Sequence, residues 1–148
     1  MTFITRRAHF NAAHRLHNPN KSDEWNRKTY GKCNSKNWHG HNYDLEVTVL
    51  GEVDEETGYV IDIGELKEII ERRIIEKCDH KNLNLDVDFL EGIIPSTENL
   101  VKAFFNEIED EVKEACKSRG MLYSIKLYET ERNYAVYCPY AQQGLQVE

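Results

Sequence analysis

The stretch Gly31–Tyr43 constrains the fold and chemistry of this 148-residue chain more than any other. It reads G-K-C-N-S-K-N-W-H-G-H-N-Y and leads into the alternating run Asp44–Leu50. Side chains two residues apart on a strand point the same way, so His39 and His41 share a face with the apolar residues that follow. Paired imidazoles on a rigid, partly apolar face are typical of a metal site, although a core histidine beside a solvated one leaves the same pattern.

A third imidazole stands near the end of an earlier strand-like segment, Phe3–Leu16. His14 joins the pair if this segment pairs with the strand after His41. Three imidazoles without another obvious ligand favour catalytic zinc, because structural zinc usually takes four protein ligands and catalytic zinc keeps one position open. Cys33 as a fourth ligand would instead close the site, so this alternative stays open. One face of the early segment carries Ile4, Ala8, Phe10, Ala12 and His14.

Composition narrows the class of protein. The net charge of −7 argues against nucleic acid as a partner, and no apolar run approaches the length of a membrane span. The segment Met1–Arg7 lacks the apolar core of a secretory signal, so we expect a cytoplasmic protein. The four cysteines are widely spaced, which in a reducing compartment predicts free thiols.

The polar stretch His17–Lys32 is predicted to be a long loop. It and the residues just after it are locally basic on an acidic chain. Both a solvated run of charge and a site for an anionic substrate fit this pattern. The basic residues are Lys21, Arg27, Lys28, Lys32 and Lys36.

The second half of the chain predicts two helices and then two strands. Asp62 caps a first helix, and Ser96 or Thr97 caps a second, for which Gly120 is the residue just past the end. The strands are Leu122–Thr130 and Asn133–Tyr140.

The whole order predicts an α+β fold, with one four-stranded antiparallel sheet and both helices on one face. We expect a single domain over residues 1–148, with a loose tail from about residue 141. The open sheet edges invite closure by oligomerisation.

Five motifs follow one another along the chain: Phe10–Leu16, Gly31–Cys33 with His39–Tyr43, Asp79–Leu83, Ser96–Leu100 and Tyr128–Thr130. Together, and in this order, they resemble the 6-pyruvoyl tetrahydropterin synthase family. The resemblance runs from about Phe3 to Tyr137 and implies the tunnelling fold, in which subunits pool their sheets into a barrel. It also implies a homohexamer of two trimers, with active sites between subunits.

The resemblance assigns a role to each matching residue, for 7,8-dihydroneopterin triphosphate as substrate. Zinc is the implied cofactor, and Mg²⁺ accompanying the triphosphate is left open. His14, His39 and His41 would bind zinc, Cys33 would abstract a proton, Asp79 and His80 would form an acid–base pair, and Glu129 would anchor the pterin with Thr97 and Glu98.

Two kinds of product occur in this family. Some members eliminate triphosphate to give 6-pyruvoyltetrahydropterin, and bacterial members give 6-carboxytetrahydropterin for queuosine synthesis. Five residues separate Cys33 from the His-Gly-His motif here, which resembles the pyruvoyl type and leaves the carboxy type as the alternative. A non-catalytic pterin- or zinc-binding protein is a third reading, against which the joint presence of Cys33, Asp79, His80 and Glu129 argues.

Overall fold

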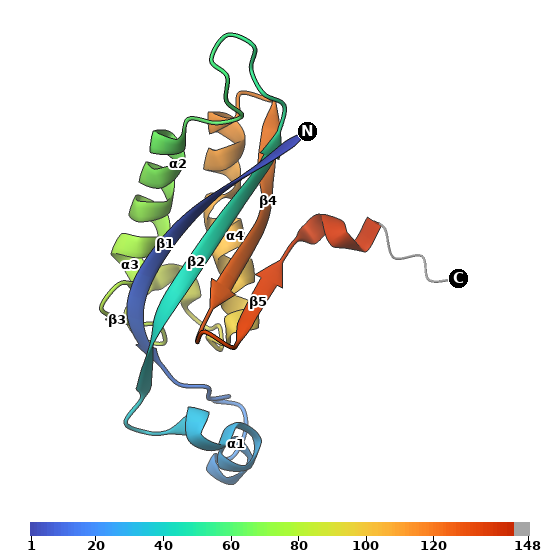
Figure 1. Cartoon of the computed structure of the whole chain (residues 1–148). Coiled ribbons are helices and arrows are strands. Elements are labelled where there is room, and N and C mark those ends of the chain that lie inside the picture. Colours follow the sequence, from blue (N-terminus) through green and yellow to red (C-terminus); the bar gives the residue numbers. More distant parts are fainter. Residues whose placement is uncertain (144–148) are drawn as a thin grey trace.

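A curved sheet with helices on one face forms the body of the chain, in a computed structural model that describes residues 1–143 (Figure 1). The strand order is β3–β1–β2–β4–β5, and all neighbours are antiparallel except β3, which runs parallel to β1. The strands are β1 (Thr2–His14), β2 (His39–Gly51), β3 (Lys81–Asn82), β4 (Gly120–Tyr128) and β5 (Tyr134–Tyr137). The helices are α1 (Asp23–Tyr30), α2 (Ile63–Ile70), α3 (Glu76–Cys78) and α4 (Thr97–Ala115).

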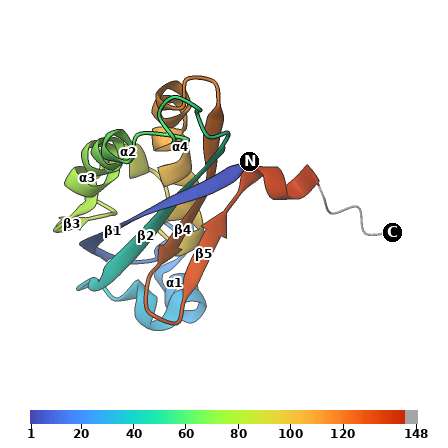
Figure 2. The ribbon, with the colours of Figure 1, turned by 45° about the horizontal axis from the view of Figure 1, so that its top comes forward.

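The predicted α+β fold, with its main helices on one face of the sheet, is confirmed (Figure 2). The strand count of four is wrong, because β3 adds a fifth strand of two residues beside Ala12 and Ala13. So short a strand has no alternating pattern to read. The π-helical turn Glu71–Ile75 joins α2 to α3 into one irregular rod, where we expected a plain helix.

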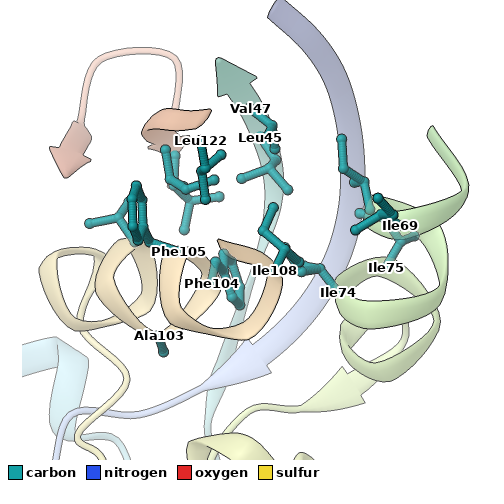
Figure 3. Close-up of a cluster of buried hydrophobic side chains, with 14 of the residues drawn as sticks. Leu45, Val47, Ile69, Ile74, Ile75, Ala103, Phe104, Phe105, Ile108 and Leu122 are labelled. Atoms are coloured by element: carbon teal, nitrogen blue, oxygen red, sulfur yellow. The ribbon is translucent and has the colours of Figure 1, made fainter. Parts of the chain in front are cut away.

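The core lies between the sheet and the helices. Tyr43, Leu45, Val47 and Val49 alternate along β2, and each is fully buried, as the period-two pattern predicts. Figure 3 shows side chains of β2, α4 and the π-helical turn gathered in this layer. Burial of this apolar layer is the main favourable term in folding, and it keeps β1 and β2 rigid up to their ends.

Both predicted helix starts are confirmed by their caps. The Asp62 carboxylate accepts a hydrogen bond from the Gly64 N–H at 2.7 Å, and the Ser96 hydroxyl oxygen accepts one from the Asn99 N–H at 3.3 Å. The latter cap fixes the first turn of α4, which carries Thr97. Such caps satisfy N–H groups that have no partner within the helix.

The predicted role of Gly120 at the end of α4 is wrong. The helix ends at Ala115, and Lys117 and Ser118 take the left-handed conformation instead, with φ of 49° and 67°. Gly120 begins β4, where a Cβ would lie 2.8 Å from the Leu50 carbonyl oxygen. Close approach of two strands, rather than helix termination, therefore requires glycine at this position.

The stretch predicted as a long loop contains α1 and the 3₁₀ turn Gly31–Asn34. Asn26 is fully buried, and its side-chain oxygen accepts a hydrogen bond from the Asn18 N–H at 2.7 Å while its amide donates to the Asn18 carbonyl at 2.9 Å. A helix held by a buried polar side chain does not need an apolar stripe. The polar sequence therefore indicated a loop. The helix lies beyond the ends of β1 and β2, apart from the other helices (Figure 1).

The last residues of β1 and β4 and the first residues of β2 and α4 lie at one end of the sheet (Figure 1). In the described residues, no helix is long and apolar enough to cross a membrane. The tail predicted to be loose lies mostly outside the described residues, of which Pro139–Gln143 form a 3₁₀ turn.

Candidate active site

Three imidazoles meet at this end of the sheet because of the register between β1 and β2. The antiparallel ladder places His14 opposite His39 and Ala12 opposite His41. The ring centroids are 4.6 Å apart for His14 and His39, and 5.0 Å apart for each of the other two pairs. One ring nitrogen from each histidine lies within 4.8 Å of the others, as a shared metal ion requires.

The hydrogen bonds of these rings leave nitrogens free to bind a cation. His14 Nδ1 lies 2.8 Å from the Pro95 carbonyl oxygen and donates to it, and the Tyr43 hydroxyl lies 3.3 Å from Nδ1 and 3.5 Å from Nε2 of the same ring. His39 Nδ1 and His41 Nε2 are buried without a hydrogen-bond partner. Buried polar atoms without partners are costly and uncommon, so the donor set fits a bound metal ion. The contact between His14 and Pro95 is the kind that orients a metal ligand from its far side.

Burial also sets the protonation state of two rings. It lowers the pKa of His14, which is 1% exposed, against the opposing effect of the hydrogen bond to the Pro95 carbonyl. Burial likewise lowers the pKa of His41, against the opposing effect of the Glu129 carboxylate. The lowered pKa values favour the neutral form of these two imidazoles, which is the form that binds metals.

A carboxylate faces the imidazoles from the end of β4. Glu129 Oε1 lies 3.6 Å from His41 Nε2, and Oε2 lies 3.9 Å from His14 Nε2. The Thr97 hydroxyl donates a hydrogen bond to Oε2 at 2.8 Å. Glu129, Thr97 and the exposed Glu98 line one pocket of about 240 Å³, so the three residues predicted to bind substrate lie together.

Cys33 lies in the 3₁₀ turn that follows α1, and its thiol is half-buried. The Leu16 N–H donates to the Cys33 carbonyl oxygen at 2.8 Å, which ties this turn to the chain just after β1. Among the described residues, the close group of potential metal ligands comprises the three histidines without Cys33. This arrangement favours an open site over one closed by a thiolate.

The Asp79–His80 pair lies elsewhere in the same chain. His80 Nδ1 is 2.8 Å from Asp79 Oδ2, and the Asn11 N–H donates to Asp79 Oδ1 at 2.9 Å. The hydrogen bond from Asn11, followed by the one to His80, lowers the pKa of Asp79. The pair shares a pocket with His9 and other residues of the open face of the sheet, whereas His14 points to the helix face.

Backbone strain marks two residues beside these groups. His80 has a φ of 58°, and Trp38, directly before His39, has a φ of 64°. Bulky residues seldom adopt this left-handed conformation, and it concentrates at functional sites. Trp38 and Pro95 were both outside the predicted site. The Pro95 contact uses only a backbone carbonyl, which no sequence pattern reveals.

The fold is of the α+β class, and its site brings together three imidazoles that could hold a metal ion, with a carboxylate beside them. The family model for 6-pyruvoyl tetrahydropterin synthase matches residues 3–139. The chain therefore belongs to the 6-pyruvoyl tetrahydropterin synthase family.

Individual proteins named as 6-pyruvoyl tetrahydropterin or tetrahydrobiopterin synthases are similar to this chain over most of their length. The chain is 42% identical to a 6-pyruvoyl tetrahydrobiopterin synthase of Drosophila melanogaster, over 98% of this chain and 84% of the relative. It is 44% identical to the protein of that name from Dictyostelium discoideum, over 90% of this chain and 93% of the relative. The solved structure of 6-pyruvoyl tetrahydropterin synthase from Caenorhabditis elegans has a TM-score of 0.82 and 35% identity, covering 93% of this chain and 94% of that one.

The three-imidazole site predicts how metal content responds to substitution. The purified protein should hold about one zinc per chain, and His14→Ala, His39→Ala and His41→Ala should each lose most of it, because two imidazoles bind zinc far more weakly than three. The matched control is His9→Ala, since His9 lies on the same strand as His14 with its side chain on the other face. Elemental analysis after dialysis measures the content, and full zinc retention in His39→Ala would contradict the site.

Proposed function

We propose that this protein is a zinc-dependent lyase that eliminates triphosphate from 7,8-dihydroneopterin triphosphate to give 6-pyruvoyltetrahydropterin. The observation that carries the proposal is the meeting of three imidazoles, two with unpartnered buried nitrogens, beside Glu129 in a chain of this family. Four free thiols support a reducing compartment, and we place the reaction in the cytoplasm.

The three histidines are the residues that would hold zinc. Bound there with an open position, zinc would act as a Lewis acid toward an oxygen of the substrate side chain and so acidify the adjacent C–H bond. His14 would be held in place by Pro95, and His39 and His41 by the start of β2. The rigid strands would keep the three rings in one geometry whether or not substrate is present.

Glu129 is proposed to bind the pterin ring. A carboxylate can accept two parallel hydrogen bonds from adjacent N–H groups, which is the pattern on the pterin edge. The Thr97 hydroxyl holds one carboxylate oxygen, and Glu98 lines the same pocket. The carboxylate would thus place the substrate side chain next to the imidazoles, because Glu129 lies between 3.6 and 3.9 Å from two of them.

Cys33 is proposed to abstract the proton, with Asp79 and His80 as the acid–base pair. The separation of the pair from the imidazoles within one chain supports an active site that forms between subunits. The exposed edge strands β3 and β5 offer backbone groups through which copies could pair. We therefore propose a homohexamer in which the sheets form a barrel and His80 of one copy faces Cys33 of another.

Two other functions stay as alternatives. A 6-carboxytetrahydropterin synthase would use the same substrate, but the relatives named above, which match nine-tenths of the chain or more, carry the pyruvoyl name. A non-catalytic pterin- or zinc-binding protein would not need Cys33, Asp79 and His80 together with Glu129.

The product of the reaction tests the proposal directly. We expect the zinc-loaded protein to convert 7,8-dihydroneopterin triphosphate to 6-pyruvoyltetrahydropterin with release of inorganic triphosphate, measured by liquid chromatography with mass detection. Mg²⁺ is included in one series and omitted from another, which settles whether it assists the triphosphate. Formation of 6-carboxytetrahydropterin would support the first alternative, and binding without turnover the second.

A substitution of Glu129 separates pterin binding from metal binding. Glu129→Gln should weaken binding of 7,8-dihydroneopterin by about tenfold or more, because a neutral amide cannot accept the same charge-assisted pair of hydrogen bonds. Zinc content should stay near one per chain. Glu131→Gln is the matched control, two residues on in the exposed turn. Unchanged affinity in Glu129→Gln would refute the assignment, and a parallel loss of zinc would make Glu129 a ligand instead.

Mixed oligomers test whether subunits share the active site. Cys33→Ala and His80→Ala should each lose about 10²-fold or more in turnover, as expected for loss of a proton-transfer group. Co-assembled in equal amounts, the two variants should recover about a quarter of the wild-type activity, because random pairing restores both groups at that fraction of sites. Cys138→Ala, which removes the other half-buried thiol, should stay active alone. If verified mixed oligomers recovered no activity, Cys33 and His80 of one active site would have to come from the same chain.

A further inference from the structure

A cationic pocket lies between α1 and the chain that leads into β2. It has a volume of about 270 Å³, and its lining includes the basic side chains of Arg15, Arg27 and Lys36. Asp23 is the carboxylate of the lining, so three positive charges face one negative charge. The whole chain carries a net charge of −7, so the pocket is opposite in sign to the rest of the protein.

The positive charges of this pocket have no anionic partner in the described part of the chain. None of the three basic side chains forms an ion pair within 4.0 Å there. Arg15 donates one hydrogen bond to His17 Nδ1 at 3.0 Å, while its Nε is buried without a partner. A buried guanidinium N–H without an acceptor is costly, so the Arg15 guanidinium keeps unused donor capacity beside the pocket that it lines.

The pocket adjoins the candidate active site along three segments. Arg15 directly follows His14, and its guanidinium carbon lies 5.7 Å from the ring centroid of Trp38, which directly precedes His39. The 3₁₀ turn that lines the pocket also carries Cys33. A molecule that reached the imidazoles and Cys33 could therefore extend a further charged group into the pocket.

We propose that this pocket binds the triphosphate chain of the substrate, an inference that rests on the proposed function. Guanidinium groups bind phosphate oxygens in bidentate fashion, and the Lys36 ammonium adds a compact charge with three donors. Arg27 lies on α1, which the hydrogen bonds of the buried Asn26 fix in place, so the backbone that carries this cation is positioned before substrate arrives. The pocket thereby fixes the end of the substrate opposite the pterin ring.

The first experiment measures binding of inorganic tripolyphosphate to the zinc-loaded, full-length oligomer. The chain has two tryptophans, so Trp25→Phe leaves Trp38, beside Arg15, as the one tryptophan whose emission is followed. We expect a saturable change in its emission. Arg27→Gln and Lys36→Gln should each raise the dissociation constant by about tenfold, the loss of one charge-assisted hydrogen bond.

Lys28→Gln and Lys32→Gln are the matched controls. Both lysines are exposed neighbours of the pocket residues, and neither lines the pocket. They should leave the dissociation constant unchanged. Equal weakening by all four substitutions would mean a diffuse effect of charge, and would overturn the proposal. Failure of tripolyphosphate to bind would also overturn it, and would indicate that a neighbouring copy fills the pocket.

Turnover supplies the second measurement. Arg27→Gln and Lys36→Gln should raise KM for 7,8-dihydroneopterin triphosphate about tenfold and lower kcat/KM by at least as much, since they remove contacts to the triphosphate. Binding of unphosphorylated 7,8-dihydroneopterin should not change. An unaltered KM would overturn the proposal even in an active enzyme. The unsubstituted protein could also prove inactive while tripolyphosphate binding is lost only in these two variants. That result would reject the proposed function and support the anion site.

Discussion

The pairing of β1 with β2 is the constraint on which the rest of the structure depends. Thirteen residues of each strand are in register, and the last rungs of the ladder place His14 opposite His39. A slip of one residue would turn His39 and His41 to the open face of the sheet and disperse the imidazoles. The register is held by the buried face, where the rings of Phe10 and Tyr43 stack at 4.9 Å. The register that packs the core therefore also brings the three imidazoles together.

The site has an energetic cost that a metal ion would offset. Burying a ring nitrogen without a partner costs about 1–3 kcal/mol, and two such nitrogens lie in the cluster. The cost is tolerated because the surrounding strands and α4 are tightly packed. The groups proposed to move protons lie instead on short turns, Cys33 after α1 and His80 after α3. Rigid elements thus carry the proposed metal ligands, and segments that a neighbouring subunit could meet carry the groups proposed to move protons.

Most of the fold follows from patterns that one segment contains by itself. The alternation in β2, the caps at Asp62 and Ser96, and the apolar stripe of α4 each indicate a local structure that the molecule adopts. The wrong predictions arise where the interaction that fixes the structure is polar or joins segments that are distant in the sequence. Asn26 organises α1 through hydrogen bonds, and the second strand packed against Gly120 is remote in the chain.

In the candidate site, too, the features that depend on local patterns could be predicted, and those that depend on tertiary structure could not. The alternation of His39 and His41 is local, so the sequence places both on one face, and the pairing with His14 needs only one ladder. The position of Asp79 relative to the imidazoles depends on where its segment meets the edge of β1, at the Asn11 N–H, and no local pattern reveals this. The basic stretch was ambiguous for a similar reason: tertiary structure alone brings Arg27 and Lys36 beside Arg15 and leaves Lys28 and Lys32 outside the pocket.

X-ray absorption at the zinc edge of the substrate-free protein tests the central claim most directly, that three imidazoles form an open metal site. The account predicts a first shell of nitrogen and oxygen atoms only, with zinc–nitrogen distances of about 2.0–2.1 Å and the multiple scattering of three histidine rings. A zinc–sulfur distance of about 2.3 Å would contradict it, because Cys33 would then be a ligand that closes the site.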